Sequence, residues 1–499
     1  MDRARASGAL VSIAVLQVLT ILVGIVRSKG LAQVLGLAGF GVAGALDQAI
    51  LTAVTFGAFA LPYTAMKFMA RSHSESEAEF RHTGAGFLRL LLVMAIVTAS
   101  IAYAVFTWFP ALLGDDLAIY NRELRIAAIG IVPAMLLLLF VNTFAAAQKP
   151  GTGAAVNLVY LAGAAIASIL GGYVYGLTGL YVASVATAIV LTFAGLAYLQ
   201  RTLGINLTDA HSGVIKQLRS DPRILGYAAC FYATLLGYML TLLVARTVVL
   251  AQVGAEAAGH LQAAFSIALA FGAVFTSLNN LYLAPLVNRR ADVADKVATT
   301  SDFTGHVLVL LLLGVLPIVL FPGVFLQTLF SADFVPMASV LWWFALWQCI
   351  TLIGNAYQQL LVGLDDVVYI AVAAIVSYGS MLVAMPPLAQ VYGLAGIGIA
   401  LCGGVVLHFT LLVLRVRLKH GGRIPARVSI RLAGLVAVVV SAHFVFAGRH
   451  EIGVAPIAAR VGFAALALLV GWFALDKQER DPRGLIASLR GNAGPATGP

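Results

Sequence analysis

The sequence predicts an all-α polytopic membrane protein with about fourteen transmembrane helices. They are expected to form two pseudo-symmetric six-helix lobes around a central cavity, followed by two C-terminal helices. Three observations support this fold class: the composition, the length of the apolar segments, and an internal repeat. Of the 499 residues, 61% are hydrophobic and 10% are charged, whereas soluble domains carry roughly 25% charged residues. A soluble fold has no use for that much apolar surface.

The apolar segments recur along the whole chain and are separated mainly by short polar stretches. Each can cross a hydrocarbon core of about 30 Å as a helix of about twenty residues. The expected spans are 9–30, 42–62, 84–108, 125–147, 154–175, 179–199, 226–250, 259–286, 305–321, 338–361, 368–389, 393–414, 431–447 and 457–475.

Basic residues predict the orientation, because Lys and Arg are retained on the cytoplasmic side during insertion. Most of the 31 Lys and Arg fall on segments that share the side of the N-terminus. The sequence therefore predicts that the N-terminus and the C-terminus are both cytoplasmic. The net charge of +10 is spread over many short loops, which this topology explains without a nucleic-acid partner.

Two pairs of motifs reveal an internal repeat. Segments 27–34 and 246–253 both read R-x-x-x-L-A-Q-V, and segments 175–179 and 392–396 both read Y-G-L-x-G. The shift along the chain from the first copy to the second is nearly the same for the two pairs. Two matches at nearly one offset indicate duplication. They also favour a retained first span over a cleaved signal peptide.

The repeat unit contains six helices, so both copies cross the membrane in the same direction and form parallel repeats. The expected organisation is an N-lobe at 1–200, a cytoplasmic linker at 201–225, a C-lobe at 226–415, two further helices at 416–480 and a cytoplasmic tail at 481–499.

Enzymatic and cofactor motifs are absent from the sequence. No Gly-Lys dipeptide occurs, which excludes a P-loop, and no zinc-protease, serine-hydrolase or paired-cysteine motif is present. Residues 39–44 match G-x-G-x-x-G but lie between two membrane helices with no preceding strand, so dinucleotide binding is not expected. The three cysteines are far apart and suggest neither a disulfide nor a metal. We expect a transporter with no cofactor and no metal.

Charges within the spans indicate the chemistry of the substrate. Among the 21 carboxylates only Asp47 is clearly inside a span, whereas Arg27, Lys29 and Arg246 lie at matching places near the ends of the first and seventh spans. A guanidinium can bind a phosphate through two parallel hydrogen bonds, so these three cations predict a cationic cavity for a phosphate-bearing substrate. Snorkelling of the same arginines to lipid headgroups is the alternative. Asp47 is either a salt-bridge partner of Arg27 or Lys29, an ion-coupling site, or part of the outer rim.

Several polar and aromatic side chains within the spans could contact a glycan. Four amides would suit sugar hydroxyls if they face a cavity, although hydrogen bonds between helices explain them equally well. These are Asn142, Gln262, Asn355 and Gln358. Three tryptophans at 342, 343 and 347 begin a span where an aromatic belt at the outer interface is expected.

The order of these motifs resembles the multidrug/oligosaccharidyl-lipid/polysaccharide exporter superfamily, and within it the O-antigen and enterobacterial-common-antigen type translocases. The resemblance covers nearly the whole chain. It rests on R-x-K-x-x-A-x-x-L-G-x-A-G-x-G at 27–41, K-F-M-A at 67–70, Arg246, Y-L-A-P-L at 282–286, Phe334 and Met337 before W-Q at 347–348, and the Y-G-L-x-G repeats.

The resemblance implies a V-shaped transporter that alternates between inward-open and outward-open forms. Its implied substrate is an undecaprenyl-diphosphate-linked oligosaccharide, an O-antigen or exopolysaccharide repeat unit, moved to the periplasmic leaflet of the bacterial inner membrane. The implied partners are that substrate, membrane lipids, a polysaccharide polymerase and a chain-length regulator. Only Arg27 and Arg246 match in position and are carried over from the family.

Three alternatives stay open at the level of sequence. Lipid II type flippases are similar around Arg27 and Gly36, and cation-coupled multidrug exporters belong to the same superfamily. The shortage of carboxylates within the spans argues against an exporter of cations. A membrane-embedded polymerase or ligase is the third alternative, but the longest outer connections, 109–124 and 322–336, are too short for a domain.

Overall fold

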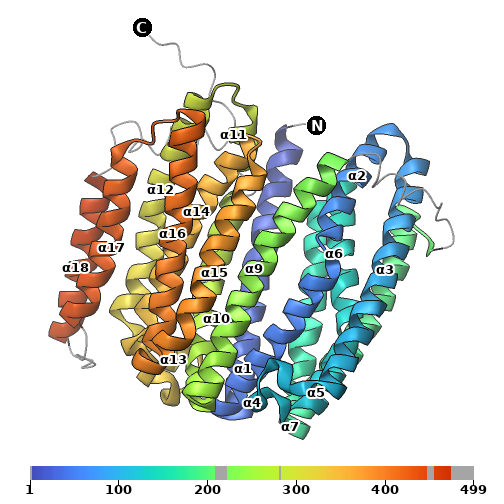
Figure 1. Ribbon diagram of the computed structural model, residues 1–499, viewed down its shortest axis with the longest axis horizontal. Coiled ribbons are helices and arrows are strands. Elements are labelled where there is room, and N and C mark those ends of the chain that lie inside the picture. Colours follow the sequence, from blue (N-terminus) through green and yellow to red (C-terminus); the bar gives the residue numbers. More distant parts are fainter. Residues whose placement is uncertain (1–2, 208–221, 280–282, 447–453, 474–499) are drawn as a thin grey trace. The chain divides into compact units, whose positions relative to one another are not determined.

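The computed structural model describes residues 3–207, 222–279, 283–446 and 454–473. That part of the chain is helical throughout (Figure 1). The elements are α1 Arg3–Ala58, α2 Leu61–Glu75, α3 Glu77–Trp108, η1 Pro110–Leu113, α4 Asp115–Ala118, α5 Asn121–Ile129, α6 Ile131–Ala146, α7 Pro150–Leu203, α9 Pro222–Gln252, α10 Ala255–Leu278, α11 Ala284–Arg289, α12 Val293–Leu320, α13 Pro322–Leu329, η4 Ala332–Ser339, α14 Leu341–Gly363, α15 Val367–Tyr392, α16 Leu394–His420, α17 Ala426–Phe446 and α18 Val454–Phe473.

Two of these helices are too long for one crossing. The 56 residues of α1 would span about 84 Å as a straight helix, and the 54 residues of α7 about 81 Å. Each is interrupted by a glycine in the left-handed region, Gly36 with φ 68° in α1 and Gly176 with φ 59° in α7. Figure 1 shows α1 running down from the N-terminus and returning towards α2. Each long helix is therefore a hairpin of two antiparallel arms.

Nine helices in the described part are long and apolar enough to cross a membrane, and a tenth is obtained if the bent pair η4 and α14, at 66°, is counted as one span. The chain is therefore a multi-pass membrane protein. Within the described residues, each of the fourteen expected spans overlaps one or more helices, with two spans on each of the hairpins α1 and α7. The number of crossings stays a prediction, because length and composition alone select the nine or ten.

Residues with left-handed backbone recur in pairs along the chain. The pairs are Gly36 with Gly254, Gln148 with Asp365, Gly176 with Gly393, and Gly204 with Gly421. The shift from the first member to the second is the same in the last three pairs and almost the same in the first. Positive φ values disfavour side chains with a Cβ, so each position marks a specific turn. The shift matches that of the sequence motifs, and the duplication is therefore visible in the backbone.

The chain packs as two compact units. Unit 1 contains residues 1–266, 329–331 and 382–394, and unit 2 contains residues 267–328, 332–381 and 395–499. Unit 1 therefore holds α1 to α7 together with α9 and the first half of α10. This division follows packing, not the repeat, so the expected lobe boundaries stay a prediction. Parts of the expected linker and the expected tail at 481–499 lie outside the described residues.

The largest side chains in the core of unit 2 come from α14. Trp347 is 1% exposed and Tyr357 and Phe344 are 0% exposed. Trp342 is also buried, at 7%, and stacks on Trp343 and on the ring of His443. A tryptophan of an aromatic belt faces the lipid headgroups. The expectation of a belt is therefore wrong for Trp342 and Trp347, which contribute to internal packing instead.

Candidate functional site

The hairpin of α1 brings Arg27 and Asp47 together. Gly36 turns the chain, so Arg27, nine residues before it, and Asp47, eleven residues after it, lie opposite each other on the two arms. Arg27 Nη2 donates a hydrogen bond to Asp47 Oδ2 at 2.9 Å. The two side chains are 34% and 35% exposed. The structure thus assigns Asp47 the salt bridge with Arg27, and both groups remain reachable from outside the protein.

Helix α7 supplies two further polar groups to this pair. The hydroxyl of Tyr181 lies 3.0 Å from Asp47 Oδ1 and 3.2 Å from the carbonyl oxygen of Ala43. Arg27 Nε donates to Ser168 Oγ at 3.4 Å. Tyr181 is 4% exposed and Ser168 is 0% exposed. The second carboxylate oxygen is therefore held by a donor that packing fixes in place.

The hairpin formed by α9 and α10 repeats this arrangement with different partners. Gly254, with φ 108°, makes the turn between the two helices. Arg246 Nε donates to Gln262 Oε1 at 3.1 Å, and Nη1 donates to the carbonyl oxygen of Leu242 at 3.1 Å. The guanidinium carbon lies 4.5 Å from the ring centroid of Phe265. Arg246 is 5% exposed, so neutral groups satisfy a buried cation.

The two hairpins pack against each other within unit 1. A Cβ at Gly41 would lie 2.2 Å from the backbone nitrogen of Gly259, and a Cβ at Gly44 would lie 2.4 Å from Gln262 Oε1. The glycines of the G-x-G-x-x-G segment therefore permit a close helix crossing, which small residues favour in membranes. Asp47 also interacts electrostatically with Arg246. The cluster Arg27–Asp47–Arg246 therefore contains two arginines and one carboxylate, a formal net charge of +1.

The other sequence-predicted residues are Lys29 and three amides. Lys29 is exposed and follows Arg27 by two positions, which on a helix places it on a different face. Asn142 Nδ2 donates to the carbonyl oxygen of Leu138, one turn earlier in α6, at 2.7 Å. Asn355 and Gln358 are half-buried on α14 in unit 2. Of the four amides, the structure joins only Gln262 to the arginines.

Tyr181 and Ser168 were not predicted from the sequence. Serine and tyrosine are common in membrane helices, and no motif marks either residue. The available signal was the position of Tyr181, which follows the Y-G-L-T-G turn by two residues. The described residues contain no group of three or more side chains that could hold a metal, and the three cysteines are free.

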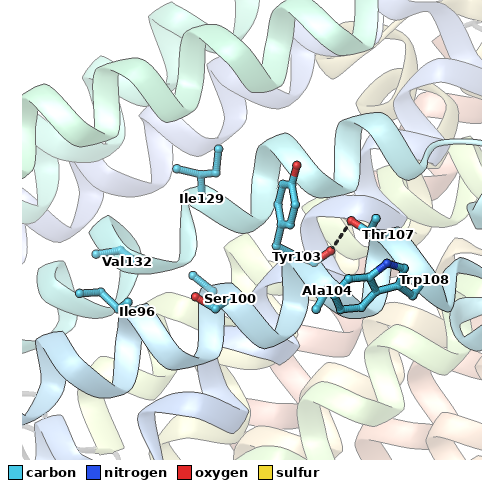
Figure 2. Close-up of a pocket in the computed structure, with 9 residues that line it drawn as sticks. Ile96, Ser100, Tyr103, Ala104, Thr107, Trp108, Ile129 and Val132 are labelled. Atoms are coloured by element: carbon cyan, nitrogen blue, oxygen red, sulfur yellow. Dashed lines mark hydrogen bonds between the residues drawn. The ribbon is translucent and has the colours of Figure 1, made fainter.

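A separate groove lies between α3 and the α5–α6 pair (Figure 2). Its volume is about 420 Å³, and its lining includes Ile96, Tyr103, Trp108 and Ile129. Trp108 is 72% exposed and Ile129 is 49% exposed. No charged side chain is among the lining residues, and none of the arginine cluster contributes to it. The groove therefore has the chemistry of a membrane-facing surface.

No protein-family model and no curated protein matches the sequence. Solved structures do match. The lipid II flippase MurJ in an inward-closed conformation is 14% identical, with a TM-score of 0.68 over 93% of this chain and 97% of that chain. An inward-facing multidrug resistance MATE family transporter of the MOP superfamily is 12% identical, with a TM-score of 0.62 over 85% of this chain and 96% of that chain. A eukaryotic MATE transporter is 14% identical, with a TM-score of 0.54 over 88% and 99%.

Proposed function

We propose that this chain, which has the fold shared by the MurJ flippase and the MATE transporters, is a flippase for a lipid-linked oligosaccharide. The substrate would be an O-antigen or exopolysaccharide repeat unit on undecaprenyl diphosphate, moved from the cytoplasmic to the periplasmic leaflet by alternating access. The protein acts as a transporter and not as an enzyme. Its partners would be the lipid-linked substrate, membrane lipids, and a polysaccharide polymerase with a chain-length regulator.

The observation that carries this proposal is the net positive charge of the arginine cluster. Arg27 and Arg246 lie in hairpins that pack against each other, and Asp47, the partner of Arg27, is the one carboxylate of the cluster. A diphosphate offers several acceptor oxygens to two guanidinium groups, and charge-assisted hydrogen bonds of this kind are about twice as strong as neutral ones. In an outward-facing or occluded state a diphosphate would pair with both arginines.

Two other transport functions share this fold. A lipid II type flippase also moves a diphosphate lipid, so the cluster suits it equally, and the order of sequence motifs is what favours a glycan repeat unit. A cation-coupled multidrug exporter needs acidic groups for its substrate or its coupling ion. The cluster of one carboxylate between two arginines disfavours a cation.

Reconstitution tests the proposal. Purified protein in liposomes should move a diphosphate-linked glycolipid between leaflets without ATP, because the chain has no nucleotide-binding motif. Protein-free liposomes loaded with the same lipid serve as the control. A strict requirement for ATP, or equal movement in protein-free liposomes, contradicts the proposal. Efflux of an organic cation with no lipid movement would assign the chain to the exporters.

The proposed location is the bacterial inner membrane with both termini in the cytoplasm. Reporter fusions after Tyr63 and Leu199 should lie inside, and fusions after Phe109 and Pro322 should lie outside. An alkaline-phosphatase fusion that is active after Leu199 would contradict this topology, because that enzyme is active only outside the cytoplasm.

A further inference from the structure

Asp47 is the anion that pairs with Arg27 in this structure. Its Oδ2 accepts the hydrogen bond from Arg27 Nη2 at 2.9 Å, and a phosphate oxygen makes the same charge-assisted contact with a guanidinium. We propose that Asp47 is an internal counter-anion which the incoming diphosphate displaces from Arg27 and which returns to release it. This inference rests on the proposed function.

The pair is accessible enough for such an exchange. The Arg27 and Asp47 side chains are 34% and 35% exposed, so an anion can approach Arg27 without unfolding the hairpin. By contrast, Arg246 is 5% exposed and is held by Gln262 and by the carbonyl oxygen of Leu242. A neutral amide does not compete with a phosphate as an anion does. The exchange of anions therefore belongs to Arg27 alone.

The displaced carboxylate keeps two favourable contacts. The Tyr181 hydroxyl lies 3.0 Å from Asp47 Oδ1, whereas the hydrogen bond from Arg27 goes to the other carboxylate oxygen. Asp47 also interacts electrostatically with Arg246. A buried carboxylate without any partner costs free energy in a membrane protein. Asp47 without Arg27 would still have the Tyr181 hydroxyl as a donor and the charge of Arg246 nearby. Asp47 can therefore give up Arg27 and still keep the Tyr181 hydroxyl as a hydrogen-bond donor at its other carboxylate oxygen.

Displacement has opposite effects on binding and on release. Binding of the diphosphate must break the ion pair, so Asp47 weakens the affinity. Release is accelerated because Asp47 re-forms the pair and competes with the departing phosphate. Loss of Asp47 should therefore tighten binding and slow transport. Structural damage would lower the affinity and also slow transport. Loss of a counter-anion would raise the affinity and slow transport, so the sign of the change in affinity separates the two explanations.

The test measures binding of farnesyl diphosphate to the full chain in lipid nanodiscs by isothermal titration calorimetry. A half-exposed ion pair contributes up to about 1 kcal/mol, or about fivefold in an equilibrium constant, so Asp47→Asn should bind up to about five times more tightly than wild type. Asp47→Glu retains the charge and should stay closer to wild type than to Asp47→Asn. Farnesol, which has no phosphate, should bind all variants alike.

Asp302→Asn is the matched control. Asp302 pairs with Arg427 Nη2 at 2.7 Å, with side chains 51% and 35% exposed, and it belongs to unit 2. This variant removes one carboxylate from a similar ion pair elsewhere and should bind farnesyl diphosphate as wild type does. If Asp302→Asn and Asp47→Asn raise the affinity for farnesyl diphosphate equally, the cause is the change in net charge and not the loss of a counter-anion. That result would overturn the inference.

Transport of a diphosphate-linked glycolipid in liposomes completes the test. Asp47→Asn should transport several-fold more slowly than wild type, although it binds more tightly. If wild type binds and Asp47→Asn binds equally or more weakly, the counter-anion role is wrong and the proposed function stands. If neither protein binds farnesyl diphosphate, both proposals fail. Asp47→Ser removes the same charge and replaces Asp47→Asn if that variant does not accumulate, with the same outcomes.

Discussion

The two hairpins of unit 1 place an arginine at the same position of the repeat but surround it differently. Arg27 is half-exposed and faces a carboxylate, Asp47, across the turn of α1. Arg246 is buried and faces a neutral amide, Gln262, across the turn between α9 and α10. Duplication therefore preserved the cation and the turn, whereas the partner diverged.

This difference assigns separate tasks to the two arginines. A buried guanidinium with several neutral partners has a fixed position, so we propose that Arg246 is a fixed part of the binding site. In the proposed exchange, Arg27 binds the substrate anion in place of its carboxylate partner Asp47. The predictions below test this division, beginning with the largest expected effect.

Alanine at either arginine should abolish export of the glycan. Arg27→Ala should accumulate near the wild-type level, because the half-exposed Asp47 keeps its contact with Tyr181. Arg246→Ala should also lower accumulation, since it removes the charge-assisted hydrogen bond to the half-buried Gln262 oxygen, which contributes about 1.5–3 kcal/mol. Surface glycan and protein abundance in membranes would be measured together. Full export by either variant at normal abundance would end the assignment of the cluster to the substrate.

Lysine substitutions should reduce export to different extents at the two arginine positions. Lysine retains the charge but not the two-pronged donor geometry. At position 27 it can still pair with Asp47, so Arg27→Lys should keep partial export. At position 246 it cannot contact Gln262, Leu242 and Phe265 together, so Arg246→Lys should export less than Arg27→Lys. If both lysine variants export as wild type does, the arginines only snorkel to lipid headgroups.

The contact between the hairpins depends on small residues. Gly41→Ala would place a Cβ 2.2 Å from the backbone nitrogen of Gly259, which forces the helices apart. We expect a loss of about 1–3 kcal/mol in stability, measured as a lower unfolding temperature in detergent. Gly24→Ala in the first arm of α1 is the control, because its Cβ would meet no neighbouring element within 4 Å in the described part of the chain. Equal unfolding temperatures for the two variants would contradict the close crossing.

The repeats also differ at the turn before their fifth helix, where a smaller and pH-dependent effect is expected. Asp366 in unit 2 accepts hydrogen bonds from Arg415 at 2.7 and 3.2 Å and from His420 at 3.0 Å. The equivalent position in the first copy of the repeat is occupied by Lys149. The hydrogen bonds from Arg415 hold the pKa of Asp366 well below its ordinary value.

A lowered pKa fixes the direction of the pH dependence. The ionised carboxylate stabilises the folded state above the pKa of the unfolded chain, about 3.9, and this contribution is lost as the pH falls through the folded pKa. At pH 7, Asp366→Asn should lower the unfolding temperature by about 2–4 °C. The difference from wild type should shrink below about pH 4. A difference that stays constant from neutral to strongly acidic pH would contradict an electrostatic role for Asp366.

The sequence predicted much of the fold because its signals are repeated. Long apolar segments located the helices, and the two motif pairs located the duplication that the left-handed pairs Gly36 with Gly254 and Gly176 with Gly393 display in the backbone. The sequence could not distinguish a buried tryptophan from one that faces lipid, because both occur at the end of an apolar segment. Trp347 was therefore placed at the interface, whereas it packs inside unit 2.

The candidate site was predicted only where charge marks it. Arginines and a single carboxylate are rare in apolar segments, so Arg27, Arg246 and Asp47 were visible in the sequence. Tyr181 and Ser168 were not visible, because their roles arise from the packing of α7 against α1 and leave no trace in composition. The neutral partner Gln262 was one of several amides, and its pairing depends on a turn whose geometry the sequence does not specify.

Translocation in liposomes without ATP tests the central claim most directly. Two lipids with the same glycan and the same isoprenoid chain would be compared, one joined by a diphosphate and one joined without phosphate. The account predicts that wild type moves the diphosphate lipid much faster than the phosphate-free lipid, and that the double variant Arg27→Ala/Arg246→Ala removes this preference. Equal rates for the two lipids in wild type, or an undiminished preference in the double variant, would contradict it.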